Sequence, residues 1–439
     1  MHVRSRPPHR RSIKLRKTPL RLKRSRVPLR CYPERKTMQR ATDSHRMKGC
    51  TIMDSDTSPA ESAVGRENET GVLTESDPVV LRAVRSRAVV VPLRRPIVAG
   101  IGEFDQWPLV LVDVETSDGV VGSSYIAPYR ASAMPAIVAE LRDLSDVWAG
   151  RPLAPADAFA EFGKDLNVVG IAGLSMITRS ALDMALWDAL AKSAGLPLVS
   201  LLGGTIGPTA TYNSNGLWRH KVDTLAAEAR ELRDEGGFGA MKLRLGDPDL
   251  RKDLAAVKAV RDGVGTDINV MVDFNQALGY GDAVRRCHEL DEQGLYWFEE
   301  PIAYDNVEGY ARLAGKVRTP LQWGENFYGP RDLFTYLRGG AVPYAMADLM
   351  RIGGVSGWLQ ASGLAAAAGT QLSSHLYPEI AAHLLRVTPT AHWLEWVDWA
   401  HPVLEDPCLP VEGTVTPSNR PGIGVTWDEK AVKKYTVAT

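Results

Sequence analysis

The second half of the chain alternates short apolar segments with amphipathic ones. Most of the apolar segments are near-continuous apolar runs, which are typical of strands buried on both faces of a parallel sheet. Eight strand–helix units in under about 200 residues favour a closed barrel over an open sheet. The sequence therefore predicts an α/β fold with a (β/α)₈, TIM-type barrel over residues 209–396. The predicted strands are TATYNSN, GAMKLRLG, NVMVDFNQ, LYWFEEP, LQWGEN, YAMADLMR, QLSSHLYPE and HWLEW.

The segment before the barrel has a different pattern. VVLRAVRSRAVVVPLRRP and WPLVLVDVETSDGVVGSSY read as strands joined by turns, and SMITRSALDMALWDALAKSAG reads as a helix that ends at Gly195. Strands followed by helices indicate an α+β domain over residues 79–208. Residues 397–439 form a C-terminal segment beyond the barrel.

Residues 1–78 are expected to be a disordered leader, basic at first and then acidic. Residues 1–50 hold 17 lysines and arginines against two acids, and such a run does not build a core. A nucleic-acid tail and a targeting peptide are the alternatives; the simplest interpretation is that synthesis begins near Met53. We expect no nucleic-acid partner for the body of the protein.

Composition restricts the class of protein further. No stretch approaches the roughly 20 apolar residues that a membrane span needs. The four cysteines have no metal-ligand or disulfide spacing, which favours a reducing compartment, the cytoplasm.

Acidic side chains follow three successive predicted strands at a constant interval. Asp273, Glu299 and Glu325 stand 26 residues apart, although the pattern alone does not separate Glu299 from Glu300. Adjacent strands lie about 4.8 Å apart, so carboxylates at one level can converge on one ion. Oxygen ligands select a hard cation, Mg²⁺ or Mn²⁺. The alternative is that they are surface acids at the starts of loops.

The other predicted strands also end in polar residues. Asp348 and His375 end neighbouring strands, and an Asp that accepts from one imidazole nitrogen makes the other a better general base. The remaining polar candidates at strand ends are Lys242, Arg244, Asn275, Asn326 and Glu395.

Several long segments in collinear order resemble the mandelate racemase subgroup of the enolase superfamily, from about Val79 to the C-terminus. They are TSDGVVGSSY, LDMALWDALAK, MVDFNQ, WFEEP, GEN, RIGGVSGW, SSHLYPEIAAHLL and TPTAHWLE. The resemblance implies a modified barrel under an α+β capping domain that the C-terminal segment completes, and homo-oligomers.

The resemblance also implies roles for the residues at the strand ends. It makes Asp273, Glu299 and Glu325 the ligands of Mg²⁺, and His375 with Asp348 the catalytic dyad. It makes Glu395 the acid that hydrogen-bonds a substrate carboxylate oxygen as that oxygen gains charge.

One position departs from the family pattern. The racemase motif is Lys-x-Lys, whereas this chain has Lys242-Leu243-Arg244. Arginine stays protonated, so it is a poor base. We therefore expect dehydration of an acid sugar to a 2-keto acid, with Lys242 near the substrate carboxylate. A racemase or epimerase of a 2-hydroxy acid and a non-catalytic ligand-binding relative are the alternatives.

Substrate contacts are expected from the cap. The loop over residues 94–107 is the predicted cover. The possible substrate contacts are Arg95, Tyr129, Arg130 and Trp218 from the cap side, with Asn275 and Asn326 close to the metal.

Overall fold

The computed structural model describes residues 78–99, 102–219, 221–340 and 343–439. The expectations for residues 1–77 lie outside these ranges. Within the described ranges, no helix is long and apolar enough to cross a membrane.

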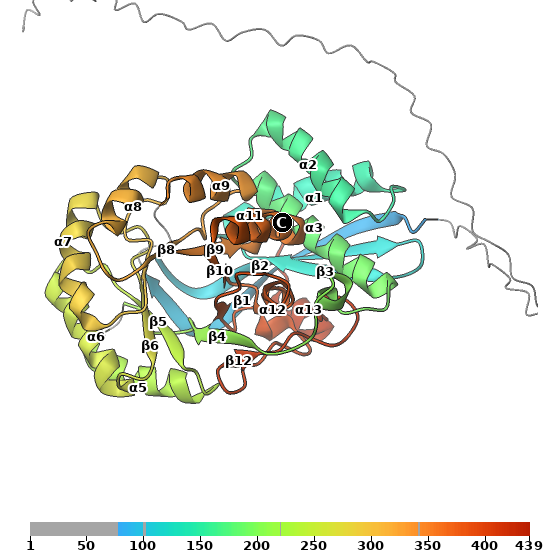
Figure 1. The fold of residues 1–439 in the computed structure, drawn as a ribbon. Helices are drawn as coiled ribbons and strands as arrows, with labels where there is room; N and C mark the ends of the chain where they lie inside the picture. The colour runs from blue at the N-terminus through green and yellow to red at the C-terminus, as the bar shows by residue number, and fades with distance from the viewer. Residues whose placement is uncertain (1–77, 100–101, 220, 341–342) are drawn as a thin grey trace, which may run out of the picture. The chain divides into compact units, whose positions relative to one another are not determined.

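Eight parallel strands form the nearly closed barrel that the sequence predicts (Figure 1). Neighbours pair in the order β10-β9-β8-β7-β6-β5-β4-β11. Backbone bonds such as Ser374 N to Trp393 O (3.0 Å) join the two ends of this order. The strands are β4 (Thr209–Asn213), β5 (Ala240–Arg244), β6 (Asn269–Asp273), β7 (Phe298–Glu299), β8 (Leu321–Trp323), β9 (Tyr344–Asp348), β10 (Gln371–His375) and β11 (Leu394–Trp396).

Helices follow most of the strands, and the amphipathic helices α5–α8 run along the outer side of the barrel (Figure 1). Their apolar faces cover the sheet, and side chains of Asp249 and Asn306 cap the first turns of α6 and α8. The helices are α5 (Val222–Asp234), α6 (Leu250–Val264), α7 (Tyr280–Leu290), α8 (Val307–Ala314), α9 (Pro330–Arg338), α10 (Leu349–Ile352), α11 (Gly354–Ala368) and α12 (Pro378–Leu385).

The capping region consists of an antiparallel sheet and helices. Strands β1 (Leu81–Ala99), β2 (Gly102–Thr116) and β3 (Val121–Ile126) pair in sequence order. Helix α3 (Leu174–Ser193) is buried on nearly every face. It packs against the cap sheet on one side and against α10 and α11 on the other, so it joins the cap to the barrel. The other helices are α1 (Met134–Trp148), α2 (Pro155–Val169) and α4 (Leu198–Leu201).

The C-terminal segment returns to the capping sheet. Trp427 Nε1 donates to Asp113 Oδ1 (2.7 Å) on β2, and Val437 N donates to Ala88 O (3.0 Å) on β1. The segment holds β12 (Thr414–Val415), which pairs with β4 of the barrel, and α13 (Glu429–Tyr435). It therefore contacts both the cap and the barrel.

The predicted cover loop is a β-hairpin instead of an irregular loop. Ile97 pairs with Phe104 and Ala99 with Gly102, and the register shifts between Pro92 and Ile97. This irregularity accommodates Pro96, which cannot donate a backbone hydrogen bond. The prediction of a loop over residues 94–107 was wrong in this respect.

The contact between β3 and α3 can be tested at Gly122. A Cβ added there would lie 2.2 Å from Ala185 O of α3. We expect Gly122→Ala to destabilise the protein by about 1–3 kcal/mol, because backbone atoms would have to shift. Urea unfolding measures it.

Gly363→Ala is the matched control. A Cβ at Gly363, on α11, meets nothing within 4 Å, so it should stabilise the helix by about 0.5–1 kcal/mol. Equal unfolding midpoints for Gly122→Ala and the wild type would contradict the packing described here.

Candidate metal centre and acid–base site

Three carboxylates converge at the carboxyl end of the barrel. One oxygen from each of Asp273, Glu299 and Glu325 lies within 4.8 Å of the others, and all three side chains are buried. Parallel pairing sets Asp273 of β6 opposite Glu299 of β7, so the two side chains stand at one level. Three buried anions this close repel one another, and a divalent cation removes that repulsion. An all-oxygen donor set fits Mg²⁺.

The structure distinguishes Glu299 from Glu300, a choice that the sequence pattern left open. Glu299 belongs to the cluster, whereas Glu300 has a positive φ of 38° and accepts hydrogen bonds from Gln276 Nε2 (2.9 Å) and Asn326 Nδ2 (3.0 Å). Glu300 is not one of the three clustered carboxylates, and these two amides hold its side chain. Asn275 orients Asp273 through its backbone and side-chain nitrogens (2.7 and 2.8 Å).

Lys242 is a buried cation within the cluster. Its Nζ lies 2.7 Å from Glu299 Oε1 and 2.8 Å from Glu395 Oε1. Burial alone would lower the pKa of Lys242, but the carboxylates of Glu299 and Glu395 outweigh burial and raise it. Lys242 is therefore a fixed positive charge and no proton acceptor.

His375 and Asp348 form the dyad geometry. His375 Nδ1 lies 2.6 Å from Asp348 Oδ2, and Asp348 Oδ1 accepts from the backbone nitrogen of Met350 (2.8 Å). With Nδ1 engaged, Nε2 faces the cluster, 3.3 Å from Glu325 Oε2 and 3.8 Å from Glu395 Oε2. Nε2 is thus the nitrogen that a substrate at the metal would meet.

Surrounding carboxylates control the protonation of His375. Burial alone would lower its pKa, but Glu325, Glu395 and Asp348 raise it to about 9. A cation held by Glu325 neutralises part of that negative charge. Metal binding should therefore bring the pKa of His375 down, towards the range in which a histidine acts as a base.

Glu395 is an acceptor in the contacts that the structure shows. It accepts from Ser214 Oγ (2.5 Å) and Leu376 N (3.0 Å), besides its pair with Lys242. Burial alone would raise the pKa of Glu395, but the nearby cations, Lys242 first, outweigh burial, and the net effect lowers the pKa. An ionised Glu395 positions Lys242 and the residue after His375. Its predicted role as a hydrogen-bond donor to substrate stays a prediction.

Arg244 is fixed by the protein on the opposite side of the cluster. It donates to the carbonyl oxygens of Ser214 (3.0 Å) and Gly216 (3.2 Å), and its guanidinium lies 4.0 Å from the ring centre of Trp218. Its Nε lies 4.0 Å from Asp273 Oδ2. Arg244 thus faces a cluster acid without a close ion pair.

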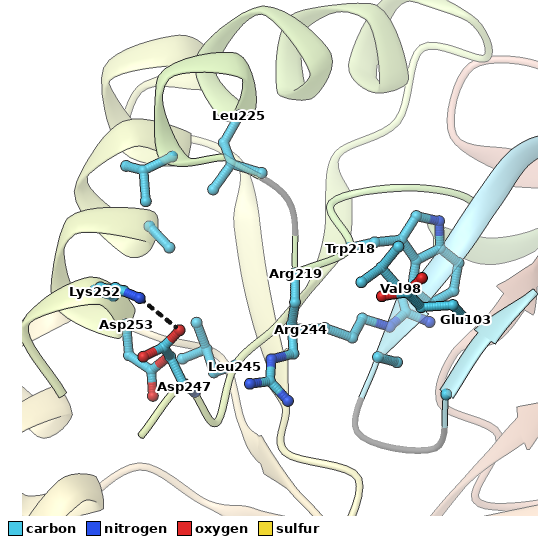
Figure 2. A pocket seen from close by; sticks show the side chains of 14 residues that line it. Val98, Glu103, Trp218, Arg219, Leu225, Arg244, Leu245, Asp247, Lys252 and Asp253 are labelled. Atoms are coloured by element: carbon cyan, nitrogen blue, oxygen red, sulfur yellow. Dashed lines mark hydrogen bonds and ion pairs between the residues drawn. The ribbon is translucent and has the colours of Figure 1, made fainter. Parts of the chain in front are cut away.

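Two cavities flank the cluster. One, of about 350 Å³, lies between the cap and the barrel and is lined by Arg244, Trp218 and Arg219 among others; Figure 2 shows the arginines projecting into it. The other, of about 300 Å³, contains Glu325 in its wall. Its lining includes the predicted substrate contacts Tyr129, Arg130, Asn275 and Asn326.

The structure also corrects and extends the list of candidate contacts. Arg95 lines neither cavity and instead pairs with Glu231 (2.6 Å) and Glu235 (3.1 Å). Sequence reasoning passed over Gln276 and Arg351, which line the cavity beside Glu325. Both stand within three residues of a predicted site residue, and this proximity was the available signal.

Comparison with known proteins decides the family. Residues 81–203 match the mandelate racemase/muconate lactonizing enzyme N-terminal domain, and residues 224–431 match the enolase C-terminal domain-like family. The chain belongs to the mandelate racemase/muconate lactonizing enzyme family of the enolase superfamily.

Relatives within this family include enzymes and magnesium-bound structures. The chain is 31% identical over 334 residues to the L-talarate/galactarate dehydratase of Salmonella typhimurium, covering 75% of this chain and 83% of that one. An enolase from alpha proteobacterium bal199 with bound magnesium is 49% identical (TM-score 0.80; 82% and 100% covered). A Bradyrhizobium enolase complexed with magnesium and mandelic acid is 40% identical (TM-score 0.79; 82% and 99% covered).

Because the three carboxylates repel one another, we expect Mg²⁺ to stabilise the folded protein. At a concentration 100 times the dissociation constant, the ion should add about 2.7 kcal/mol to the free energy of unfolding, and Asp273→Asn should remove most of that gain. Burial raises the pKa values of Asp273 and Glu299, so their protonation should weaken the effect as pH falls. Melting curves with Mg²⁺ or a chelator measure it.

Asp262→Asn, at an exposed pair with Lys258, is the control and should keep the full response. A response of Asp273→Asn equal to that of the wild type would argue against this metal site.

Proposed function

We propose that this protein removes the α-proton of an acid sugar in a Mg²⁺-dependent reaction and expels the β-hydroxyl, giving a 2-keto acid. One observation carries the proposal: a histidine–aspartate dyad faces the carboxylate cluster from one side, and a fixed arginine stands on the other. The relatives named L-talarate/galactarate dehydratase and D-gluconate dehydratase support this reaction class.

Asp273, Glu299 and Glu325 would hold the ion. Bound Mg²⁺ supplies the positive charge that stabilises the enediolate form of a deprotonated carboxylate. Lys242, paired with Glu299 and Glu395 (2.7 and 2.8 Å), is the second cation beside the substrate carboxylate.

His375 moves the protons in this proposal. Its Nε2 takes the α-proton, and the C–H electron pair enters the enediolate. The same nitrogen then gives a proton to the departing β-hydroxyl, which leaves as water when the C–O bond breaks. The enol that remains tautomerises to the 2-keto acid, so one water is lost and nothing is oxidised overall.

Arg244 favours this one-sided mechanism. Its Nη1 donates to the carbonyl oxygens of Ser214 and Gly216, and its Nη2 donates to Ser214 Oγ (2.7 Å). A guanidinium does not release its proton at ordinary pH. A racemase needs an acid or base on each face of the α-carbon, and Arg244 does not provide the second.

Racemisation or epimerisation is the second candidate. The solved relative with mandelic acid and the L-Ala-D/L-Glu epimerase of Bacillus subtilis favour it. The further proposals that the protein is cytoplasmic and homo-oligomeric stay predictions.

His375→Asn tests the proposal. The variant should lose at least about 10³-fold in turnover and in α-proton exchange with D₂O, because the general base is gone. Mg²⁺ and substrate binding should persist. NMR of galactarate and D-gluconate in D₂O, with calorimetry for binding, measures both. Unchanged exchange in this variant would remove His375 from the mechanism.

Arg244→Lys separates the two candidate reactions. A lysine can lose its proton, so slow exchange with inversion at the α-carbon should appear, while dehydration falls roughly tenfold (about 1.4 kcal/mol) because the bonds to Ser214 and Gly216 are lost. Chiral analysis of the recovered substrate measures inversion. Inversion by the wild type without keto product would favour the racemase.

A further inference from the structure

Backbone strain concentrates around the cavity beside Glu325. Within the described ranges, eight residues other than glycine have positive φ angles. Four of them line this one cavity: Tyr129 (61°), Asn275 (44°), Gln276 (61°) and Glu300 (38°). Such conformations are sparsely populated in residues other than glycine, persist only where the surrounding structure holds them, and cluster at ligand sites.

The cavity beside Arg244 provides the comparison. It is slightly larger, about 350 Å³ against about 300 Å³, and none of its described lining residues other than glycine has a positive φ. Two of its three acids are already engaged, since Asp247 pairs with Lys252 (3.3 Å) and Asp253 with Arg286 (2.5 Å). The third, Glu103, is exposed and adds a negative charge to this lining. The two cavities are therefore similar in volume, but only the one beside Glu325 is lined by residues other than glycine with positive φ angles.

A rigid hydrogen-bonding wall stands next to the metal ligands. The buried carboxylate of Glu300 accepts from Gln276 Nε2 (2.9 Å) and Asn326 Nδ2 (3.0 Å). Gln276 is held in turn, because its Oε1 accepts from Tyr304 N (3.0 Å). Carboxylate and amide oxygens fixed in this way are suited to sugar hydroxyls, whose O–H groups need acceptors.

A cation without a partner stands at the exposed edge of the same cavity. Arg130 is exposed, and its guanidinium has no ion pair or hydrogen bond with any other residue that the structure describes. Arg351, the other arginine in the lining, already donates to Glu325 O (2.8 Å). Arg130 is thus the cation in this lining that is available to an anion.

We infer that this cavity binds the non-reacting end of a polyhydroxy diacid. This inference rests on the proposed function, because the first carboxylate is placed at Glu325 and its partners. The hydroxyls beyond the β-carbon contact the wall of Glu300, Gln276 and Asn326, and the second carboxylate pairs with Arg130. Carbon–carbon bonds of about 1.5 Å give an extended six-carbon diacid a span of about 6 Å between its carboxyl carbons.

Arg130 and Arg219 make a matched test. Each lines one of the two cavities, and neither guanidinium has a hydrogen-bond or ion-pair partner among the described residues. Arg130→Met removes the cation beside Glu325, and Arg219→Met removes the one beside Arg244 (Figure 2). Both are made in a His375→Asn background, which blocks turnover. Calorimetry with Mg²⁺ then measures the dissociation constants of galactarate and of the aldonic acid of the same configuration.

We expect Arg130→Met to weaken galactarate binding at least tenfold and to change aldonate binding less than twofold. Arg219→Met should change both less than twofold. Glu300→Gln should weaken both acids, because both carry the hydroxyls.

Equal effects of Arg130→Met on the two acids, or a diacid-selective loss in Arg219→Met, would overturn the assignment. The proposed function fails separately: if the wild type exchanges neither α-proton in D₂O while Arg130 still selects the diacid, the cavity assignment stands and the activity does not. If the Mg²⁺-loaded protein binds neither acid, both fail.

Discussion

The repulsion among three carboxylates on neighbouring strands is the constraint on which the site depends. Parallel pairing places Asp273 beside Glu299, and Glu325 follows two residues beyond the end of the next strand, β8, so the barrel forces buried negative charges together. Lys242 offsets part of this charge by pairing with Glu299 and Glu395. A divalent cation offsets the rest, and its position then determines where a substrate carboxylate lies relative to His375.

The two sides of the cluster differ in chemistry because one carries a side chain that can exchange a proton and the other does not. His375 is held through one nitrogen by Asp348, which leaves the other facing the cluster. Arg244 is held through Nη1 by the backbone carbonyls of Ser214 and Gly216 and through Nη2 by the Ser214 hydroxyl, and it stacks on Trp218. A group with an available nitrogen can transfer a proton, whereas a fixed guanidinium can only donate hydrogen bonds and attract negative charge. This asymmetry favours elimination over inversion.

Sequence reasoning reached the barrel and the metal cluster because both follow from periodicity. Apolar runs at regular spacing predicted all eight strands, and the 26-residue interval predicted that three acids would meet. Periodicity could not separate Glu299 from Glu300, because a barrel strand is buried on both faces; the positive φ of Glu300 separates them. Nor could it show that the segments on either side of Pro96 and Gly102 pair as a hairpin, or that Arg95 pairs with Glu231 of α5 and with Glu235 just beyond it. Both depend on contacts between distant segments.

The most direct test is a crystal structure with Mn²⁺ and an unreactive analogue of an acid sugar. Anomalous scattering would locate the metal. We expect one metal peak among the carboxylates of Asp273, Glu299 and Glu325, with His375 Nε2 facing the α-carbon of the analogue. A metal peak elsewhere in the barrel, or an imidazole turned away from the α-carbon, would contradict it.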